Sequence, residues 1–345
     1  MRVLVCSDAV CGLSSAEAGA CLAEGWSGHR TAVVPVGEAG AGFVGAAAAT
    51  WGAVEEPVVV ADRVGTRASA GDRTVVGLPG AGVAEGPIPS AASSVALGRL
   101  LAETLPTSGA LLVDLVSDDV HDGGAGTLAA LGAEADVDLT AGVGGLVGLG
   151  RLDLTGARER LARVDLVGVV PLGQRSTPLL GLRGITSVRG RAAGQDAEPL
   201  LAADAALERL AGLAGDGLAT VPGAGACGGT ALAVLALGGR LDTGPDLALA
   251  GVRAPVDLVV TGCSVFDFAH RGGGVVASAA ALAARLLAPC VVVAGEVVIG
   301  AREMRTMGIE AAYAVRESAG DAPDGLVSSD ELAATARRVA RTWRW

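Results

Sequence analysis

The class of fold follows from residues 257–295, which read DLVVTGCSVFDFAHRGGGVVASAAALAARLLAPCVVVAG. An apolar, β-branched run leads into a polar turn, a glycine run, a helical pattern rich in Ala and Leu, and a second apolar run. Continuous apolar strands separated by a helix are typical of a parallel sheet that is buried on both faces. Arg285 and Pro289 interrupt the most apolar window, which therefore predicts a buried helix, a turn and a strand rather than a membrane span.

Other short apolar runs repeat this alternation along the chain. They read RVLVCS, RTAVVPV, VEEPVVVA, ALLVDLV, DLVGVVPL and AAYAVR, and Ala- and Leu-rich helical patterns separate many of them. The first helix has a clear start, because Ser14 stands three residues before Glu17, which is the spacing of a capping box. The sequence therefore predicts a doubly wound α/β protein.

Two stretches have the Gly, Pro and Ser content of connecting loops, one at residues 62–94 and one near residues 239–256. Strands after the second stretch resemble in kind those before the first, and the segment between carries its own strands and helices. We therefore expect an outer domain built from residues 1–78 and 256–345. Residues 79–255 are expected to form an inserted second α/β domain.

Composition and charge exclude several classes of function. The chain has 345 residues and a formal net charge of −11, with no basic run, so we expect no nucleic-acid partner. The first residues, MRVLVCSDAV, are too short and too soon charged for a secretory signal, which favours the cytoplasm and no membrane association. A small-molecule substrate is the expected partner, and a homodimer is left open.

The basic and sulfur-containing residues narrow the chemistry further. All 26 basic residues are arginine, so chemistry that needs a Schiff-base lysine or a P-loop lysine is excluded. The six cysteines form no CxxC pair, and with three histidines no zinc-ligand spacing occurs. Reduced and mostly buried thiols are expected.

Two glycine-bearing stretches are candidates for binding. Gly223, Gly225 and Gly228 match G-x-G-x-x-G before an apolar helix, but the preceding DGLATVP is a poor strand, so close packing of the helix is favoured over a dinucleotide site. Asp8 and Ser14 follow the first strand, and in an open α/β sheet the carboxyl ends of strands face the ligand crevice. Cys11 lies between them near the start of a helix, and an inert, packed thiol is favoured there over a reactive one.

Two further turns carry acids. Asp267, His270 and Arg271 follow a strand, and they suit either a kinase-like set, with Asp for magnesium or a proton and Arg for phosphate, or a polar turn that caps a helix. Residues 118–126, DDVHDGGAG, also follow a strand. Asp122 there is either a metal ligand or the N-cap of the next helix.

Taken in order, these stretches resemble the motifs of the bacterial glycerate kinase family of type 1. Residues 8–15, DAVCGLSS, are similar to that family's D-S-F-K-G-S-L-S/T, residues 35–42, PVGEAGAG, to P-x-A-D-G-G-E-G, and residues 122–126, DGGAG, to the end of G-G-S-A-T-N-D-G-G-A-G. Further along, PLLGLRG at 178–184 resembles N-P-L-x-G-x-x-G, PGAGACGG at 222–229 resembles P-G-A-G-A-A-G-G, and residues 257–267 resemble D-L-V-I-T-G-E-G-R-x-D.

The resemblance implies a two-domain fold of the glycerate kinase I kind, with a Rossmann- or flavodoxin-like outer domain and an inserted α/β domain. It also implies Mg²⁺ and ATP as cofactors, and transfer of the γ-phosphoryl group to a hydroxyl of glycerate or a related small hydroxy acid. The catalytic residues it implies are Asp8, Asp122 and Asp267, with Asp122 and Asp267 at the metal. For substrate and nucleotide it implies Ser14, Glu38, Gly123, Gly124, Arg183, Gly225, Gly228 and Arg271.

Several polar residues of these motifs depart from the family pattern. Cys11 stands in place of the first Lys, Cys263 and Val265 replace a Glu and an Arg, and Gly274 replaces a later Lys. Loss of several cations weakens a phosphoryl-transfer site. The sequence therefore predicts weakened activity and leaves open an alternative, a catalytically inactive family member that binds a metabolite or serves as an interaction scaffold.

Overall fold

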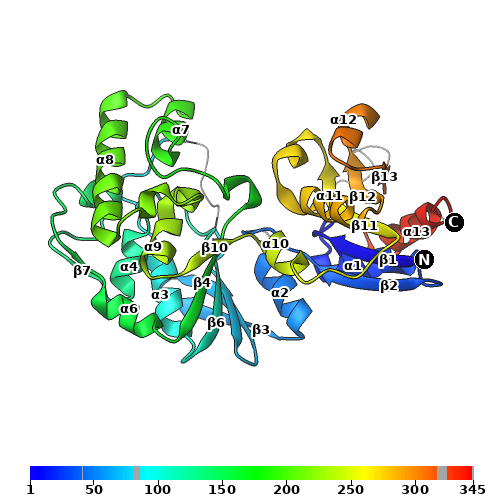
Figure 1. Cartoon of the computed structure of the whole chain (residues 1–345), viewed down its shortest axis with the longest axis horizontal. Helices are drawn as coiled ribbons and strands as arrows, with labels where there is room; N and C mark the ends of the chain where they lie inside the picture. The colour runs from blue at the N-terminus through cyan, green and yellow to red at the C-terminus, as the bar shows by residue number, and fades with distance from the viewer. Residues whose placement is uncertain (41, 81–85, 317–324, 344–345) are drawn as a thin grey trace. The chain divides into compact units, whose positions relative to one another are not determined.

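The computed structural model describes the chain except for residues 41, 81–85, 317–324 and 344–345 and the side chains of residues 271 and 272. Contacts divide the chain into two compact units. The first unit comprises residues 1–52 and 244–345, and the inserted unit comprises residues 53–243. Each unit is an α/β structure (Figure 1), as the sequence predicts.

The first unit has a five-stranded, fully parallel sheet in the order β13-β12-β11-β1-β2. Its strands are β1 (Arg2–Ser7), β2 (Arg30–Pro35), β11 (Leu258–Phe266), β12 (Cys290–Val297) and β13 (Ala311–Ala314). Numbered within the unit, this order is 2-1-3-4-5, the flavodoxin-like arrangement. The strand order therefore reverses between β1 and β11, and such sheets bind ligands beyond the carboxyl ends of the strands at this point.

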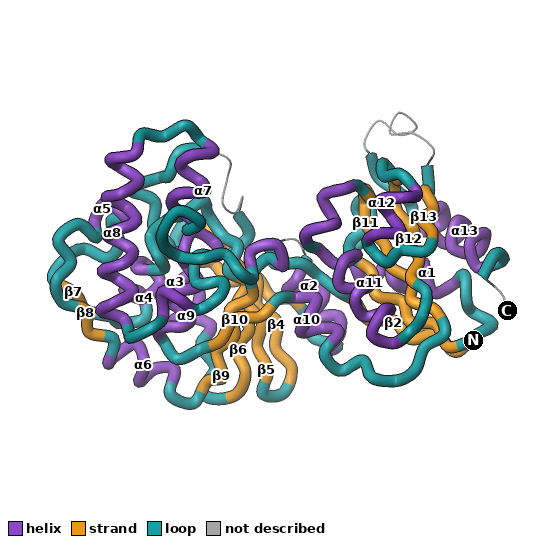
Figure 2. Tube along the Cα trace, turned by 45° about the horizontal axis from the view of Figure 1, so that its top comes forward, coloured by secondary structure: helices purple, strands orange, loops and turns teal. Residues whose placement is uncertain are grey.

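Helices cover both faces of this sheet (Figure 2). Because successive side chains of a strand point to opposite faces, Val3 and Val5 pack with α1 (Ser15–Glu24) and α13 (Ser329–Ala340), while Leu4 and Cys6 pack with α11 (Gly274–Leu286). The unit also contains α2 (Phe43–Trp51), α10 (Gly244–Leu249), α12 (Ala301–Thr306) and the 3₁₀ turn η4 (Phe268–Gly272).

The inserted unit has a six-stranded mixed sheet in the order β10-β9-β6-β5-β4-β3. Three strands form an antiparallel part, in which β4 (Arg63–Ala70) pairs with both β3 (Glu55–Val60) and β5 (Arg73–Gly77). Three further strands continue the sheet from β5 in parallel, namely β6 (Gly109–Asp114), β9 (Val164–Val169) and β10 (Arg240–Asp242). A small antiparallel pair joins β7 (Glu134–Ala135) and β8 (Leu152–Asp153).

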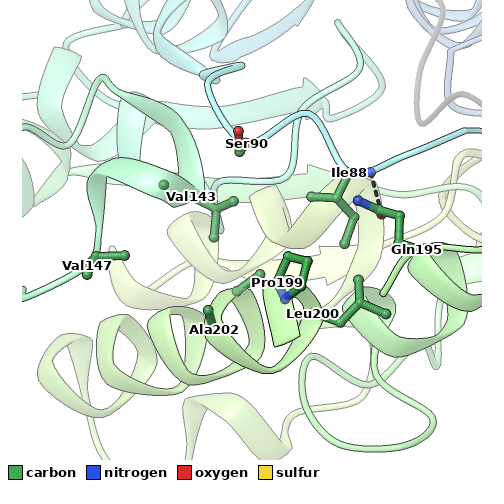
Figure 3. A pocket seen from close by; sticks show the side chains of 10 residues that line it. Ile88, Ser90, Val143, Val147, Gln195, Pro199, Leu200 and Ala202 are labelled. Carbon is green, nitrogen blue, oxygen red and sulfur yellow. Dashed lines mark hydrogen bonds between the residues drawn. The ribbon is translucent and has the colours of Figure 1, made fainter. Parts of the chain in front are cut away.

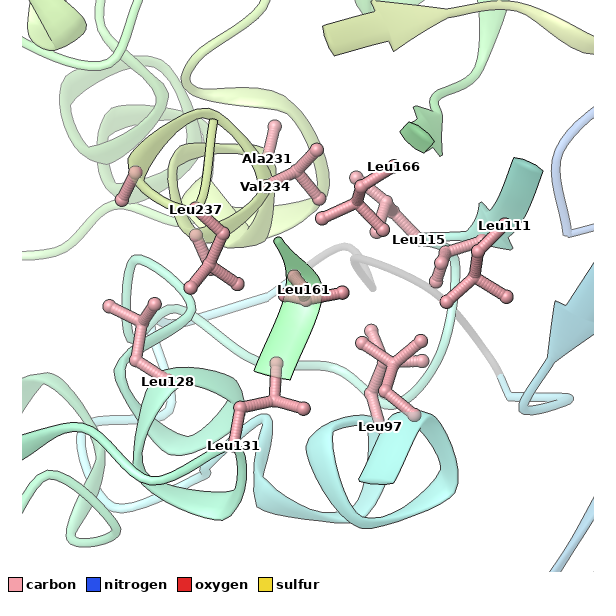
Figure 4. Close-up of a cluster of buried hydrophobic side chains, with 14 of the residues drawn as sticks. Leu97, Leu111, Leu115, Leu128, Leu131, Leu161, Leu166, Ala231, Val234 and Leu237 are labelled. Carbon is pink, nitrogen blue, oxygen red and sulfur yellow. The ribbon is translucent and has the colours of Figure 1, made fainter. Parts of the chain in front are cut away.

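Seven α-helices of the inserted unit lie within its described residues. They are α3 (Val95–Thr104), α4 (Ala125–Ala130), α5 (Gly142–Gly145), α6 (Thr155–Leu161), α7 (Ile185–Ala192), α8 (Ala197–Ala214) and α9 (Thr230–Ala236), with 3₁₀ turns η1 (Leu172–Gln174), η2 (Leu218–Thr220) and η3 (Ala226–Gly229). Leucines from α3, α4, α6 and the strands β6 and β9 form its main core together with α9 (Figure 4). Burial of apolar side chains on this scale is the principal force that holds the unit together.

The boundaries of the units differ from those expected. Residues 62–94 were expected as a connecting loop and residues 1–78 as part of the outer domain, but β4 and β5 lie in this stretch and pair with β3 and β6. The first boundary therefore falls at 52/53, and the second at 243/244 rather than 255/256. Strand β10 likewise lies in the second expected loop, where it pairs with β9.

Candidate functional site

The turn after β1 is fastened to β11 at the reversal point of the first unit's sheet. The backbone N–H of Asp8 donates to the carbonyl of Gly262 at 3.1 Å, and the N–H of Cys11 donates to the Ser264 hydroxyl at 2.8 Å. Cys11 takes a left-handed conformation with a φ of 43°. The turn therefore places Asp8 beside Gly262, in the middle of β11, and Cys11 nearer to the carboxyl end of that strand.

Asp8 has the electrostatics of a proton acceptor. Burial raises the pKa of its carboxyl from 3.8 to about 6. A hydrogen bond from the Ala9 N–H at 2.8 Å opposes this, while the negative charge of Glu38 raises the pKa further and His270 lowers it. A carboxyl that titrates near neutral pH is suited to accept a proton from a substrate hydroxyl.

Asp267 follows β11 and organises the turn after it. One oxygen, Oδ1, accepts from the Ala269 N–H at 3.0 Å and lies 3.1 Å from His270 Nδ1. The His270 ring meets the Phe266 ring edge-on, with centroids 5.7 Å apart. Asp267 thus caps η4, the structural role weighed for it in the sequence, while its side chain stays 44% exposed. The Arg271 side chain lies outside the described part of the structure.

Two thiols lie close to these carboxylates. Burial raises the pKa of Cys263, and the charges of Asp8 and Asp267 raise it further, so the thiol stays protonated at neutral pH. The Cys11 Sγ lies 3.7 Å from the carbonyl oxygen of Ser264. All six cysteines are free, as the sequence predicts.

Ser14 and Glu38 have local partners. Ser14 forms the predicted capping box, since its Oγ accepts from the Glu17 N–H at 3.3 Å and the Glu17 carboxylate accepts from the Ser14 N–H at 2.9 Å. Glu38 Oε1 accepts from the N–H of Ala39 at 3.2 Å. Of the predicted site residues with described side chains, Asp8, Ser14, Glu38 and Asp267 therefore belong to the first unit.

Asp122 belongs to the inserted unit, and its role differs from the catalytic and metal-binding one predicted. Its Oδ2 accepts from the Ser94 N–H at 2.8 Å, the Ser94 hydroxyl at 2.9 Å and the Gly126 N–H at 3.1 Å, and its Oδ1 accepts from the Gly124 N–H at 2.9 Å. The carboxylate is fully buried. Because the chain's own donors surround it, Asp122 organises the start of α4 and presents no free face to a ligand.

The glycines predicted to contact nucleotide are buried in packing contacts. A Cβ on Gly228 would lie 1.9 Å from the Val120 carbonyl oxygen, and one on Gly225 would lie 2.2 Å from that of Pro178. Gly123 and Gly124 have positive φ and face Leu207 and Ala233. The packing role that the sequence favoured for Gly225 and Gly228 is the one observed, while Arg183 is exposed and has no hydrogen-bond or ion-pair partner among the described residues.

A buried polar cluster that the sequence did not single out joins α7 to the turn before Asp122. His121 Nε2 lies 2.9 Å from Thr186 Oγ1, and Arg189 Nη2 donates to Asp119 Oδ2 at 2.7 Å. Burial, and then the charge of Arg189, lower the pKa of His121 to about 4, so its ring is neutral at physiological pH. His121 Nδ1, Asp119 Oδ1 and Arg189 Nη1 are buried with no hydrogen-bond partner among the described residues.

The ion pair in this cluster should be costly to break. Replacement of Asp119 by alanine leaves the Arg189 guanidinium, whose side chain is only 5% exposed, without a counter-charge, and should destabilise the protein by about 3 kcal/mol in urea unfolding. Asp118→Ala is the matched control, because Asp118 pairs with Arg63 near the surface and should cost less than about 1 kcal/mol. Equal costs for the two neighbouring aspartates would contradict this assignment.

The carboxylates of the first unit are chemically suited to bind a magnesium ion. Carboxylate oxygens are the protein ligands that Mg²⁺ prefers, and Glu38 and Asp267 supply them. No tight group of three or more His, Cys, Asp or Glu side chains is found among the described residues. A magnesium ion bound here would therefore keep waters and substrate oxygens as most of its ligands, as it usually does.

The comparison with known proteins covers nearly the whole chain. The model of the glycerate kinase family matches residues 3–344. The chain belongs to the glycerate kinase family. An uncharacterized protein from Mycobacterium bovis is 30% identical over 370 aligned residues, covering 99% of this chain and 91% of that protein. The glycerate 2-kinase of Escherichia coli K12 is 27% identical over 270 residues, which cover 74% of this chain and 70% of that enzyme.

The fold agrees with this membership. The crystal structure of a Salmonella typhimurium LT2 protein assigned as glycerate kinase 2 superposes with a TM-score of 0.78 at 24% identity, covering 99% of this chain and 98% of that one. The predicted two-domain glycerate kinase fold is thereby confirmed. In the described part of the chain, no helix combines the length and the apolar character needed to cross a bilayer.

Proposed function

We propose that this glycerate kinase-like protein phosphorylates glycerate or a related small hydroxy acid with Mg-ATP, at a reduced rate. The observation that carries the proposal is Asp8, a carboxyl with a pKa of about 6 at the reversal point of a flavodoxin-like sheet. A carboxyl with this pKa is mostly ionised at neutral pH and is more basic than an ordinary carboxylate, so it can accept the proton of the attacking hydroxyl.

The other residues of the first unit have supporting roles in this proposal. Glu38 and Asp267 offer carboxylate oxygens to the metal, and the contact to His270 holds the Asp267 carboxylate in place. When bound with ATP, Mg²⁺ neutralises negative charge on the phosphate oxygens. Asp122 is left out of the proposed machinery, since its carboxylate is used by the chain's own backbone.

The reduced rate rests on the residues that replace cations. The chain contains no lysine, and Cys11 and Val265 stand where the resemblance places a Lys and an Arg. Removal of one cation from a phosphoryl-transfer site costs several kcal/mol of transition-state stabilisation. Arg183, which is exposed, and Arg271 are the arginines that we propose to compensate in part.

A non-catalytic role is the alternative, and one observation favours it. Ser14 and Asp267 both serve as helix caps, which folding alone would preserve. A chain that had lost its chemistry could keep these residues for stability and still bind a metabolite in the same place.

Turnover and binding, measured on one preparation, separate the two roles. Purified protein is titrated with Mg-ATP and with D-glycerate by calorimetry, and glycerate-dependent release of ADP is then followed. We expect slow turnover that Asp267→Asn abolishes. Asp257→Asn is the matched control, because Asp257 stands just before the amino end of the same strand and pairs with Arg2. Heat from a ligand without turnover would support the non-catalytic role, and no heat with either ligand would reject the kinase.

A further inference from the structure

The inserted unit contains a pocket that is separate from the residues proposed for catalysis. It lies between the segment that holds Ile88 and Ser90, the helix α5 with Val143, and the first turns of α8 with Leu200 (Figure 3). Its cavity volume is about 290 Å³. In another protein an apolar cavity of about 150 Å³ holds benzene, so this pocket has room for a somewhat larger molecule.

Two polar groups at the pocket have hydrogen-bonding capacity to spare. The Ile88 N–H donates to Gln195 Oε1 at 2.7 Å, which fixes the orientation of that amide and leaves its Nε2 hydrogens without a partner among the described residues. The Ser90 carbonyl accepts from the Gly144 N–H at 2.9 Å, while the Ser90 hydroxyl has no partner in the described part of the chain. One donor amide and one hydroxyl therefore stand beside an otherwise apolar wall.

The lining determines what kind of molecule can bind. Ten described residues line the pocket; the eight besides Ser90 and Gln195 are aliphatic residues, a proline and a glycine, and none of the ten is charged. A charged ligand would lose its hydration here without gaining a counter-charge, whereas apolar surface gains about 25 cal/mol for each Å² removed from water. Val147 is 69% exposed, so one side of the pocket opens to solvent.

The geometry points to a binding site for a compact, uncharged molecule with an apolar body and a single amide or hydroxyl end. Its apolar body would rest against Ile88, Val143 and Leu200, and its polar end would bond to the Gln195 amide. This ligand class differs from the hydroxy-acid anion and nucleotide of the proposed kinase. The pocket is therefore a second site, and it stands whether or not the chain is a kinase.

Benzamide and benzoate form a matched pair of probes, because they share a shape and differ in charge. Binding to the full chain is measured by saturation-transfer NMR and by the shift in melting temperature. We expect benzamide to give a signal and to raise the melting temperature, and benzoate to do neither at the same concentration. No signal from benzamide, or equal signals from both, would overturn the site.

Two variants on the exposed face of α8 test whether benzamide binds in this pocket. Ala202 lines the pocket and Ala205, one turn later on α8, does not, while both are exposed, so neither substitution by phenylalanine should disturb the fold. Ala202→Phe should abolish the benzamide signal, and Ala205→Phe should leave it unchanged. Benzamide binding that survives Ala202→Phe would refute the assignment.

Discussion

Substitution of Gly228 by alanine is expected to destabilise the inserted unit by at least about 3 kcal/mol. Gly228 has a φ of +66°, which costs an alanine about 1–2 kcal/mol on its own. The new Cβ would also lie 1.9 Å from the Val120 carbonyl oxygen and 3.2 Å from the His121 Cα. Both of these atoms are backbone atoms, so no side-chain rotation can relieve the contact.

The surroundings leave little room for the backbone to move. The Gly228 carbonyl accepts a hydrogen bond from the Gly123 N–H at 3.4 Å, and a Cβ on the neighbouring Gly229 would lie 3.0 Å from the Gly123 Cα. The two glycine turns are thus pressed together. A shift that accommodated an alanine at Gly228 would separate α9 from the turn that Asp122 organises.

Gly217→Ala supplies the control for this prediction. Gly217 has a similar φ of +77° in the same unit, but nothing lies within 4 Å of the position that a Cβ would take there. Its replacement should cost only the conformational term of about 1–2 kcal/mol. Urea unfolding of the two variants measures the difference, and similar losses of stability would show that the contact with Val120 is unimportant.

Most strands could be predicted because they coincide with apolar, β-branched runs of the sequence. Each apolar run identified in the sequence, from RVLVCS to AAYAVR, contains or overlaps a strand of the structure. Strands β1, β11 and β12 are buried over most of their length, whereas β2 and β3 keep much of theirs exposed. Strands β4 and β5 were missed. Their residues RVGTRASA and RTVVG are rich in Gly, Ser and Arg, and they become strands through antiparallel pairing with β3 and each other.

The candidate site was predictable to the extent that it follows strand ends. Asp8 and Asp267 each follow one of the two parallel strands between which the strand order reverses, although β11 continues past the end of β1 and Asp8 lies beside Gly262. His270 was noticed in the sequence but not chosen, since its contact with Asp267 and its charge effect on Asp8 depend on the turn's geometry. Asp122 was misassigned because the Ser94 donors that occupy it come from another part of the chain.

The buried ion pair of Asp119 and Arg189 could not be predicted from the sequence. Asp119 and Arg189 are 70 residues apart, and no spacing rule connects a turn after a strand to the middle of a later helix. Only the packing of α7 against the turn makes them partners. A charge pair of this kind has no local sequence signal.

Replacement of Asp8 by asparagine is expected to lower kcat/KM by about 10²- to 10⁴-fold, because asparagine cannot accept a proton. The wild-type kcat/KM should rise about tenfold per pH unit on the acid side and level off above about pH 6, where the Asp8 carboxyl becomes ionised. The residual activity of the variant should lack this inflection. A wild-type profile without an inflection near that pH would show that Asp8 is not the base.

Stability distinguishes this loss of activity from unfolding. The pKa of Asp8 is raised in the folded state from its ordinary value of 3.8 to about 6, so the ionised carboxyl opposes folding. This destabilisation is absent below about pH 3.8 and complete above about pH 6. Asp8→Asn should therefore stabilise the protein at neutral pH by up to about 3 kcal/mol and leave its stability in acid unchanged. A variant that is both more stable and less active at neutral pH is the signature of a carboxyl retained for chemistry at a cost to folding. Loss of activity together with loss of stability would instead assign Asp8 to the scaffold.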